Sequence, residues 1–334
     1  MAELTVAAAL ALGLVNLAVS KGAARAELLA HAGIDPADLE DRDTRIPFPR
    51  YVALMRAGQD LAGDPALALH YGELRDFSEI SIVGLIGNAS ETMLEAFAQL
   101  NRYGRLVVEF DGPLDRFQLV REGEDLWMVD TRQNPNAFSE LTESTFAGMV
   151  CGPRRFGVSQ FVKAVQVTHP APGYRAEYER IFQAPVIFDC ERNAMLLDEK
   201  WIFHRIQLQP RYAFGILSQH ADALLASLEG AKTTRGQVEA LLTPILHTGE
   251  ASMVAIAGKM AMSRPTLARR LKAEGMTFEA VLDDLRRRMA LDYLAARKVS
   301  VNETAYLVGF SEAAAFSRAF KRWTGKSPRE VRAG

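Results

Sequence analysis

The sequence has few of the residues from which disulfide frameworks and metal centres are built. Its 334 residues include two cysteines, Cys151 and Cys190, without a CxxC spacing, and six histidines scattered without metal-ligand spacing. Two distant cysteines cannot form the disulfide framework of a secreted domain, so we interpret them as buried thiols in a reducing cytoplasm. The sequence predicts no metal centre.

Common catalytic motifs are missing too. There is no HExxH, Walker A loop, GxGxxG after a strand, or GxSxG elbow. Cys151 lies in Val-Cys-Gly-Pro, not in the Pro-Cys-His context of a reactive repair cysteine. The sequence therefore predicts no cofactor and no enzyme.

A hydrophobic run long enough to cross a membrane is also absent. Residues 5–20 are nearly all apolar, but a spanning helix needs about 20 apolar residues. A signal peptide needs a basic start, and the only early charged side chain is Glu3. We expect an Ala/Leu-rich helix buried in the first domain and no membrane association, with an uncleaved targeting segment as the alternative.

The net charge is small, because 39 Lys and Arg nearly balance 41 Asp and Glu. The balance is uneven along the chain: residues 231–334 hold 18 bases and 10 acids, which leaves 21 bases and 31 acids in residues 1–230. A basic C-terminal third predicts an anionic partner, with a solvated charged surface as the alternative. Turn-forming residues at 230–236 favour a linker between domains at 1–230 and 231–334.

Hydrophobic periodicity predicts an α+β fold for the acidic body. Helical patterns cover 24–32, 48–62, 65–71, 80–86, 90–103, 134–148 and 174–182, and Ser90 is the expected N-cap of the helix at 90–103. Apolar or alternating runs at 106–110, 116–120, 126–130, 161–168 and 186–188 predict strands.

Apolar helices over a short sheet can enclose a pocket with few polar groups, so this body is a candidate sensor for a small-molecule effector. Polar side chains that could contact an acidic or amphipathic effector are Arg45, Arg50, Tyr51, His70 and Arg75, although each residue type is also common at ordinary surfaces and in ion pairs. The helical seam at 212–229 predicts either a homodimer contact or packing on its own domain. Its apolar positions are Phe214, Leu217, Ala221, Leu224 and Leu228.

The C-terminal third repeats one pattern twice: a short helix, a tight turn and a basic helix. In the first copy, Val254, Ile256 and Ala257 are expected to face inward from a helix at 253–259. Ser263 is the expected N-cap of a basic helix at 264–273, whose Leu267 and Leu271 face the core. These segments predict a helix-turn-helix.

The second copy has a helix at 302–308 with Ala305 and Leu307 inward, a turn at Gly309-Phe310-Ser311, and a basic helix at 312–323. The spacing of Phe310, Phe316, Phe320 and Trp323 predicts a small helical core rather than a base-stacking set. A helix at 278–296 joins the copies and spans about 28 Å. This length suggests two recognition helices about one DNA turn apart, since successive major-groove faces recur at ~34–36 Å.

These residues resemble the AraC/XylS family of bacterial transcription regulators. The resemblance is carried by Val254-Ala255-Ile256-Ala257, by Ser263 to Leu271, and most specifically by Gly309-Phe310-Ser311-Glu312 and Phe316 to Pro328. The body resembles the arabinose-binding-type sensor domain of some members, through Leu28 to Pro36, Gly63 to Leu69, Val167 to Pro172, and Phe182 to Ala194. The expected fold is therefore an α+β sensor domain followed by an all-α domain with two helix-turn-helix units joined by a long helix.

The resemblance implies that exposed faces of the two basic helices enter the major groove. The matching positions are Arg264, Pro265, Thr266, Ala268, Arg269 and Lys272 in the first unit, and Ala313, Ala314, Ala315, Ser317, Arg318, Lys321 and Arg322 in the second. Arg269 could read guanine or contact phosphate. The alanines offer only apolar contact, so we expect the first unit to supply most base discrimination and the second to anchor. Arg286, Arg287 and Arg288 could face phosphate or pair with Asp283 and Asp284.

Taken together, the sequence predicts a cytoplasmic regulator that binds double-stranded promoter DNA. The family resemblance implies a homodimer, a small-molecule effector of unknown identity and contact with RNA polymerase. An effector-independent regulator is the alternative within the same class, and an enzyme domain tethered to DNA is the alternative from another class.

Overall fold

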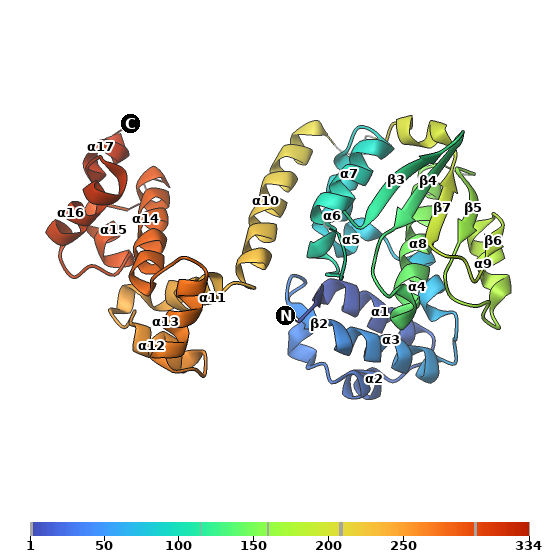
Figure 1. The fold of residues 1–334 in the computed structure, drawn as a ribbon, viewed down its shortest axis with the longest axis horizontal. Coiled ribbons are helices and arrows are strands. Elements are labelled where there is room, and N and C mark those ends of the chain that lie inside the picture. The colour runs from blue at the N-terminus through green and yellow to red at the C-terminus, as the bar shows by residue number, and fades with distance from the viewer. Residues whose placement is uncertain (1–2, 114, 159, 207–209, 297–298, 334) are drawn as a thin grey trace. The chain divides into compact units, whose positions relative to one another are not determined.

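The computed structural model describes residues 3–113, 115–158, 160–206, 210–296 and 299–333. Arg297 and Lys298, two of the bases counted above, lie outside the described residues. The chain divides into two compact units, Met1–Leu225 and Ala226–Gly334, and each is considered by itself (Figure 1).

The first unit begins with a helical layer around the apolar N-terminal run. β1 (Thr5–Ala7) pairs antiparallel with β2 (Arg45–Pro47), so the first three residues of the run form a strand rather than a helix. The rest of the run is α1 (Ala8–Ser20), whose Leu10, Leu14 and Val15 are buried, which confirms the expected core helix. No helix within the described residues is long and apolar enough to cross a membrane.

Helices expected from periodicity surround α1. They are α2 (Arg25–Ala32), α3 (Phe48–Ala62) and α4 (Leu67–Leu74), and the 3-10 turn η1 (Pro36–Leu39) lies between α2 and α3 in the chain. The left-handed backbone of Gly33 and Gly63 ends α2 and α3, a conformation that costs glycine least.

A five-stranded mixed sheet forms the other half of the first unit, in the order β3-β4-β7-β5-β6 (Figure 1). The strands are β3 (Phe117–Glu122), β4 (Asp125–Asp130), β5 (Val162–Gln166), β6 (Val186–Ile187) and β7 (Asn193–Leu197). All pairs are antiparallel except β5 with β6. The central strand β7 was not predicted, because its five residues carry no alternation of apolar and polar positions.

The strand predicted at 106–110 is wrong. The 3-10 turn η2 (Gly104–Leu106) closes there, and the amides of Val107 and Val108 both donate to the carbonyl of Gly104 at 3.0 Å. Val108 then makes only an isolated bridge to Val6. Local turn hydrogen bonds therefore prevail over the apolar pattern.

Helices pack beside the sheet to complete this unit. They are α5 (Phe77–Ile80), α6 (Ile82–Ala89), α7 (Met93–Tyr103), η3 (Pro135–Phe138), α8 (Glu140–Arg154), α9 (Arg175–Phe182) and η4 (Glu199–Phe203). The N-cap of α7 is Thr92, which accepts from the Glu95 amide at 3.2 Å, whereas Ser90 Oγ donates to Ile86 at the end of α6. The Ser90 prediction is therefore wrong. The helix predicted at 134–148 starts later, because Asn134 is left-handed and Pro135 opens η3.

Most of α10 (Arg211–Gly230) belongs to the first unit, which ends at Leu225, and this part of the helix packs on its own domain along part of the predicted seam. Ala221 is buried, and Phe214, Leu217 and Leu225 contact the helical core. Tyr103 and Arg102 also donate to Asp222, each at 2.8 Å. These contacts favour own-domain packing for these positions, while Tyr212 and Ile216 are exposed.

The second unit is all-helical, as predicted. Its elements are α11 (Thr234–Leu242), η5 (Thr243–Thr248), α12 (Met253–Lys259), α13 (Arg264–Ala273), α14 (Phe278–Ala296), α15 (Val301–Leu307), α16 (Ala313–Thr324) and α17 (Pro328–Ala333). The predicted linker at 230–236 is shorter than expected, because Thr233 caps α11 by accepting from the Gly236 amide at 2.9 Å. One core joins both helix-turn-helix units, with α11 and α14 contributing to it.

Candidate nucleic-acid interface and ligand cavity

The first helix-turn-helix sets the basic helix α13 on a small buried core. Ser263 Oγ accepts from the Thr266 amide at 3.3 Å, and Pro265 lies in the first turn, where a missing N–H costs little. Leu267 and Leu271 are fully buried, as expected. Val254 was expected to face inward but is 59% exposed, because it lies about 200° around the α12 axis from buried Ile256.

The outer face of α13 carries the residues predicted to contact DNA. Thr266 is half-buried, and its hydroxyl lies 2.9 Å from Ser263 Oγ, within the helix cap. Among the described residues, Arg264, Arg269 and Lys272 have no acidic partner within ion-pair distance. The exposed members of the predicted set are Arg264, Pro265, Ala268, Arg269 and Lys272.

The second helix-turn-helix is built around a tight glycine turn. Ser300 and Glu303 form a capping box at the start of α15. Gly309 has a φ of +79°, and a Cβ there would lie 2.2 Å from the carbonyl oxygen of Leu246. Val308 is fully buried whereas Leu307 is only half-buried, so the inward position was misplaced by one residue.

The basic helix α16 turns its aromatic side chains into the core, as predicted. Phe316 and Phe320 are fully buried with ring centroids 5.5 Å apart, and Phe310 packs edge-on against Phe316 at 5.7 Å. Of the predicted DNA-contact set on this helix, Ala314, Arg318, Lys321 and Arg322 are exposed, and Ala313, Ala315 and Ser317 are half-buried. Ala313 packs against the core.

The three consecutive arginines of α14 are engaged within the protein. Arg287 donates to Asp284 at 2.6 Å, and Arg288 pairs with Glu239 of α11. Arg286 donates to the carbonyls of Val308 and Gly309 at 3.1 and 3.3 Å. The sequence left open whether these arginines face phosphate or form contacts within the protein, and in the structure they form contacts within the protein.

Asp283 and Arg286 hold the second unit from neighbouring turns of α14. Asp283 accepts from Trp323 Nε1 and from Arg322, both at 3.1 Å. Arg286 fixes the glycine turn and stacks on Phe310, 4.8 Å from the ring centroid. Burial lowers the pKa of Arg286. The sequence predicted Asp283 as a possible partner of the arginine run, but not its contacts with Trp323 and Arg322 or those of Arg286 with the glycine turn, because these partners are distant in sequence.

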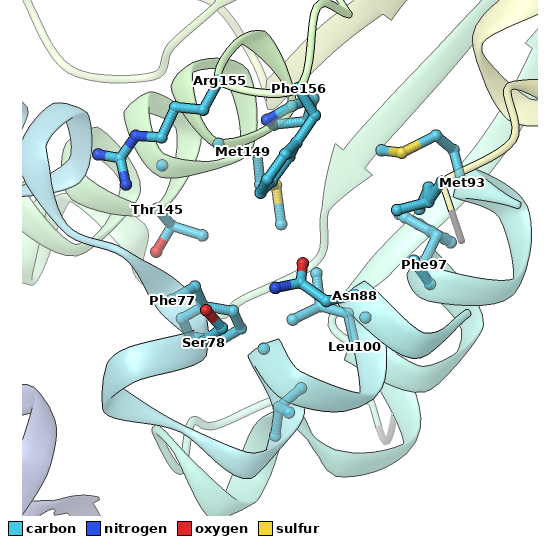
Figure 2. A pocket seen from close by; sticks show the side chains of 18 of the residues that line it. Phe77, Ser78, Asn88, Met93, Phe97, Leu100, Thr145, Met149, Arg155 and Phe156 are labelled. Carbon is cyan, nitrogen blue, oxygen red and sulfur yellow. The ribbon is translucent and has the colours of Figure 1, made fainter. Parts of the chain in front are cut away.

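The first unit encloses a cavity of about 220 Å³, hereafter the ligand cavity, between α5, α6, α7, α8 and the sheet (Figure 2). Figure 2 shows Met93 and Phe97 on one side, Met149 and Phe156 on another, and the Asn88 amide directed into the space between them. Four methionines from four elements line it, which no local pattern reveals: Met93, Met128, Met149 and Met195.

Of the five predicted effector contacts, only Arg75 lines this cavity. Arg45 donates to Thr5 Oγ1 at 2.9 Å and to its carbonyl at 3.0 Å, and thus holds β1. Arg50 is exposed, and its Nη1 lies 3.9 Å from Asp38. Tyr51 is fully buried, and burial raises its pKa.

The fifth candidate, His70, bridges two carboxylates, with Nδ1 at 2.7 Å from Asp64 and Nε2 at 2.9 Å from Glu177. Burial alone would raise the pKa of Asp64, but hydrogen bonds from Lys21 and His70 bring it below its ordinary value. His70 therefore lies in an ion cluster that joins α4 to α9.

Two basic helices rest on one core, and several of their outward cations have no acidic partner among the described residues. These features define a DNA-binding transcriptional regulator of the helix-turn-helix class. The chain belongs to the AraC family: the model "Arabinose-binding domain of AraC transcription regulator, N-term" matches residues 22–205, and a helix-turn-helix domain model matches residues 256–334. The matched domains and relatives are those of transcription regulators, not of enzymes.

Relatives match at both full length and domain level. The chain is 27% identical over 323 residues to the ornithine utilization regulator of Pseudomonas aeruginosa, covering 96% of this chain and 94% of that protein. It is 39% identical over 101 residues, 30% of each chain, to the HTH-type transcriptional regulator VirS of Mycobacterium tuberculosis. The crystal structure of the regulator CdpR from Pseudomonas aeruginosa is similar over 92% of this chain and 96% of that one, with a TM-score of 0.40 and 22% identity.

Proposed function

We propose that this regulator binds promoter DNA through both helix-turn-helix units and that a small molecule in the ligand cavity controls it. Residues 231–334 bind DNA, and residues 1–230 bind the effector and support a homodimer. The protein acts in the cytoplasm, and the DNA-bound state contacts RNA polymerase.

One observation carries the DNA-binding part. The scaffold arginines of α14 are engaged within the protein, whereas Arg264, Arg269, Lys272 and Arg318 are exposed without an acidic partner among the described residues. Cations left unpaired on a recognition helix are available to phosphates and base edges.

The test is genome-wide mapping of the sites bound by the full-length protein, followed by binding of purified protein to those promoters. Effector control predicts that promoter affinity changes with one member of a metabolite panel that includes ornithine, because of the relative's name. An effector-independent regulator would bind unchanged across the panel. Turnover of a panel member would instead support the tethered enzyme.

The dimer and polymerase contacts have separate tests. Sedimentation of the free protein measures the oligomeric state, and transcription in vitro with purified polymerase measures activation. A monomer at micromolar concentration would remove the dimer from the proposal.

A further inference from the structure

The charged side chains that line the ligand cavity differ in whether they have hydrogen-bond or ion-pair partners within the protein. Asp76 accepts from the Ser78 amide at 2.9 Å and from Ser78 Oγ at 2.7 Å, and these hydrogen bonds hold its pKa below the ordinary value. Arg155 donates to the carbonyls of Glu73 and Leu74 at 2.8 and 2.7 Å. Both groups are already engaged within the protein.

Arg75 is different. No carboxylate of the described residues lies within ion-pair distance of it, and its buried Nε has no hydrogen-bond partner there. Its guanidinium stacks on the rings of Tyr71 and Phe77, 5.4 and 5.7 Å from their centroids. Gly148 makes room for it, since a Cβ at that position would lie 2.9 Å from Arg75 Nη2. Arg75 is thus a cation at the edge of the cavity without a carboxylate partner in the part of the chain that the structure describes.

A second hydrogen-bond donor in the lining also lacks an acceptor. Trp201 is 8% exposed and stacks on Phe161 at 5.5 Å, and its buried Nε1 has no hydrogen-bond partner among the described residues. Indole and guanidinium groups only donate hydrogen bonds, so both require an acceptor. Arg75 Nε and Trp201 Nε1 are thus two donors of the described lining that lack an acceptor, while the Asn88 amide can both donate and accept. None of the carboxylates in that lining is free to pair with an ammonium group.

From this we infer that the effector is an amphipathic carboxylate, with an apolar body among Met93, Phe97 and Met149 and a carboxylate that pairs with Arg75. The inference rests on the proposed function, namely that this cavity holds the effector. It disfavours amino acids and diamines, because a buried ammonium without a counter-charge is costly. The apolar body contributes affinity through burial, and the carboxylate contributes specificity.

The experiment uses the full-length protein and straight-chain probes of four to ten carbons, each as a carboxylate, a primary amide and an amine. Thermal shift and titration calorimetry measure binding. At the best chain length we expect the carboxylate to bind at least about tenfold more tightly than the amide, as for a charge-assisted hydrogen bond. We expect no shift from the amine.

Variants of the cation separate charge from packing. Arg75→Gln should reduce the preference for carboxylate over amide to near unity, and Arg75→Lys should retain most of it. Arg175→Gln, at an exposed arginine of α9 outside the cavity lining, is the control and should retain the full preference. Circular dichroism and promoter binding report whether each variant folds. An amine or amide that binds wild type as tightly as the carboxylate overturns the inference, as does an unchanged preference in folded Arg75→Gln.

A cavity-filling variant, Ala96→Phe, distinguishes this failure from failure of the proposed function. If another head group is preferred and Ala96→Phe abolishes its binding, the cavity is the effector site and only the carboxylate assignment is wrong. If no probe binds wild type, the carboxylate assignment is rejected. If, in addition, Ala96→Phe leaves promoter regulation in cells unchanged, effector control through this cavity is rejected as well.

Discussion

At the scale of single residues, the distinction that matters is between cations that have a partner and cations that do not. Arg45, Arg286 and Arg287 are bound to carbonyls or carboxylates of the protein. Arg269 and Arg318 are exposed and have no acidic partner among the described residues. Composition alone does not separate these two groups.

Arg269→Ala is expected to relax base preference in the operator, because loss of a bidentate contact to guanine costs ~1–3 kcal/mol of discrimination. Arg318→Ala is expected to weaken binding to all sequences similarly, since a phosphate contact carries no sequence information. Binding to operator variants at fixed salt measures both effects. The reverse pattern would reassign the reading role to the second unit.

Gly309→Ala tests the turn of the second unit. Its φ of +79° and the 2.2 Å approach of Leu246 O to a Cβ predict destabilisation by at least about 1–3 kcal/mol. Gly258→Ala in α12 is the matched control, since nothing lies within 4 Å of its Cβ position, and it should be neutral or stabilising by about 0.5–1 kcal/mol. Chemical denaturation measures the change, and equal effects of the two variants would contradict the account.

At the scale of elements, α14 does more than separate two DNA-binding units. Asp283 and Arg286 attach the second unit to α14, while Asp284 and Arg288 attach α14 to α11 through Arg235 and Glu239. The orientation of α16 therefore depends on side chains of the connecting helix.

Arg286→Gln is expected to weaken protection of the second unit's half-site while the first unit's half-site stays protected. Arg287→Gln, on the same helix but paired only locally with Asp284, is the control and should leave both half-sites protected. A footprint of each variant on one operator measures the protection of each half-site separately. Uniform loss at both half-sites in a folded Arg286→Gln protein would contradict a positioning role.

The ion cluster at His70 predicts acid sensitivity of the first unit. Because the pKa of Asp64 in the folded protein is below its ordinary value, the carboxylate contributes stability above about pH 4 that is lost as pH falls through the folded pKa. Asp64→Asn should lower the free energy of unfolding near neutral pH and match wild type at low pH. Asp60→Asn, exposed on α3, is the control. A difference in the free energy of unfolding between wild type and Asp64→Asn that persists at low pH would contradict this linkage.

The extent to which sequence predicts this fold follows from how local each feature is. Residues 48–62, 253–259, 264–273 and 278–296 form helices with the expected bounds, since caps and a 3.6-residue period are local signals. Strand β7 was missed because its residues do not alternate between apolar and polar, and the segment at 106–110 was misjudged because local hydrogen bonds close the turn η2 there. The ligand cavity could not be predicted because its lining residues are distant in sequence. Arg75 was named, but Asn88, Met149 and Trp201 come together only through folding.

At the scale of the whole molecule, an acidic unit and a basic unit share one chain of almost zero net charge. DNA affinity should fall steeply with salt, with a logarithmic slope of ~0.9 per phosphate contact. Residues 231–334 alone should bind random DNA more tightly at low salt than the full chain does, because the acidic body opposes non-specific association. Equal affinities in a salt titration would contradict this account of the charge.

The most direct test of the central claim is a hydroxyl-radical footprint of the full-length protein on a mapped operator. Two helix-turn-helix units joined by the 19-residue helix α14 predict two protected segments per bound chain, with centres about one helical turn (~34–36 Å) apart. Protection of a single major-groove segment per chain would contradict DNA binding by both units.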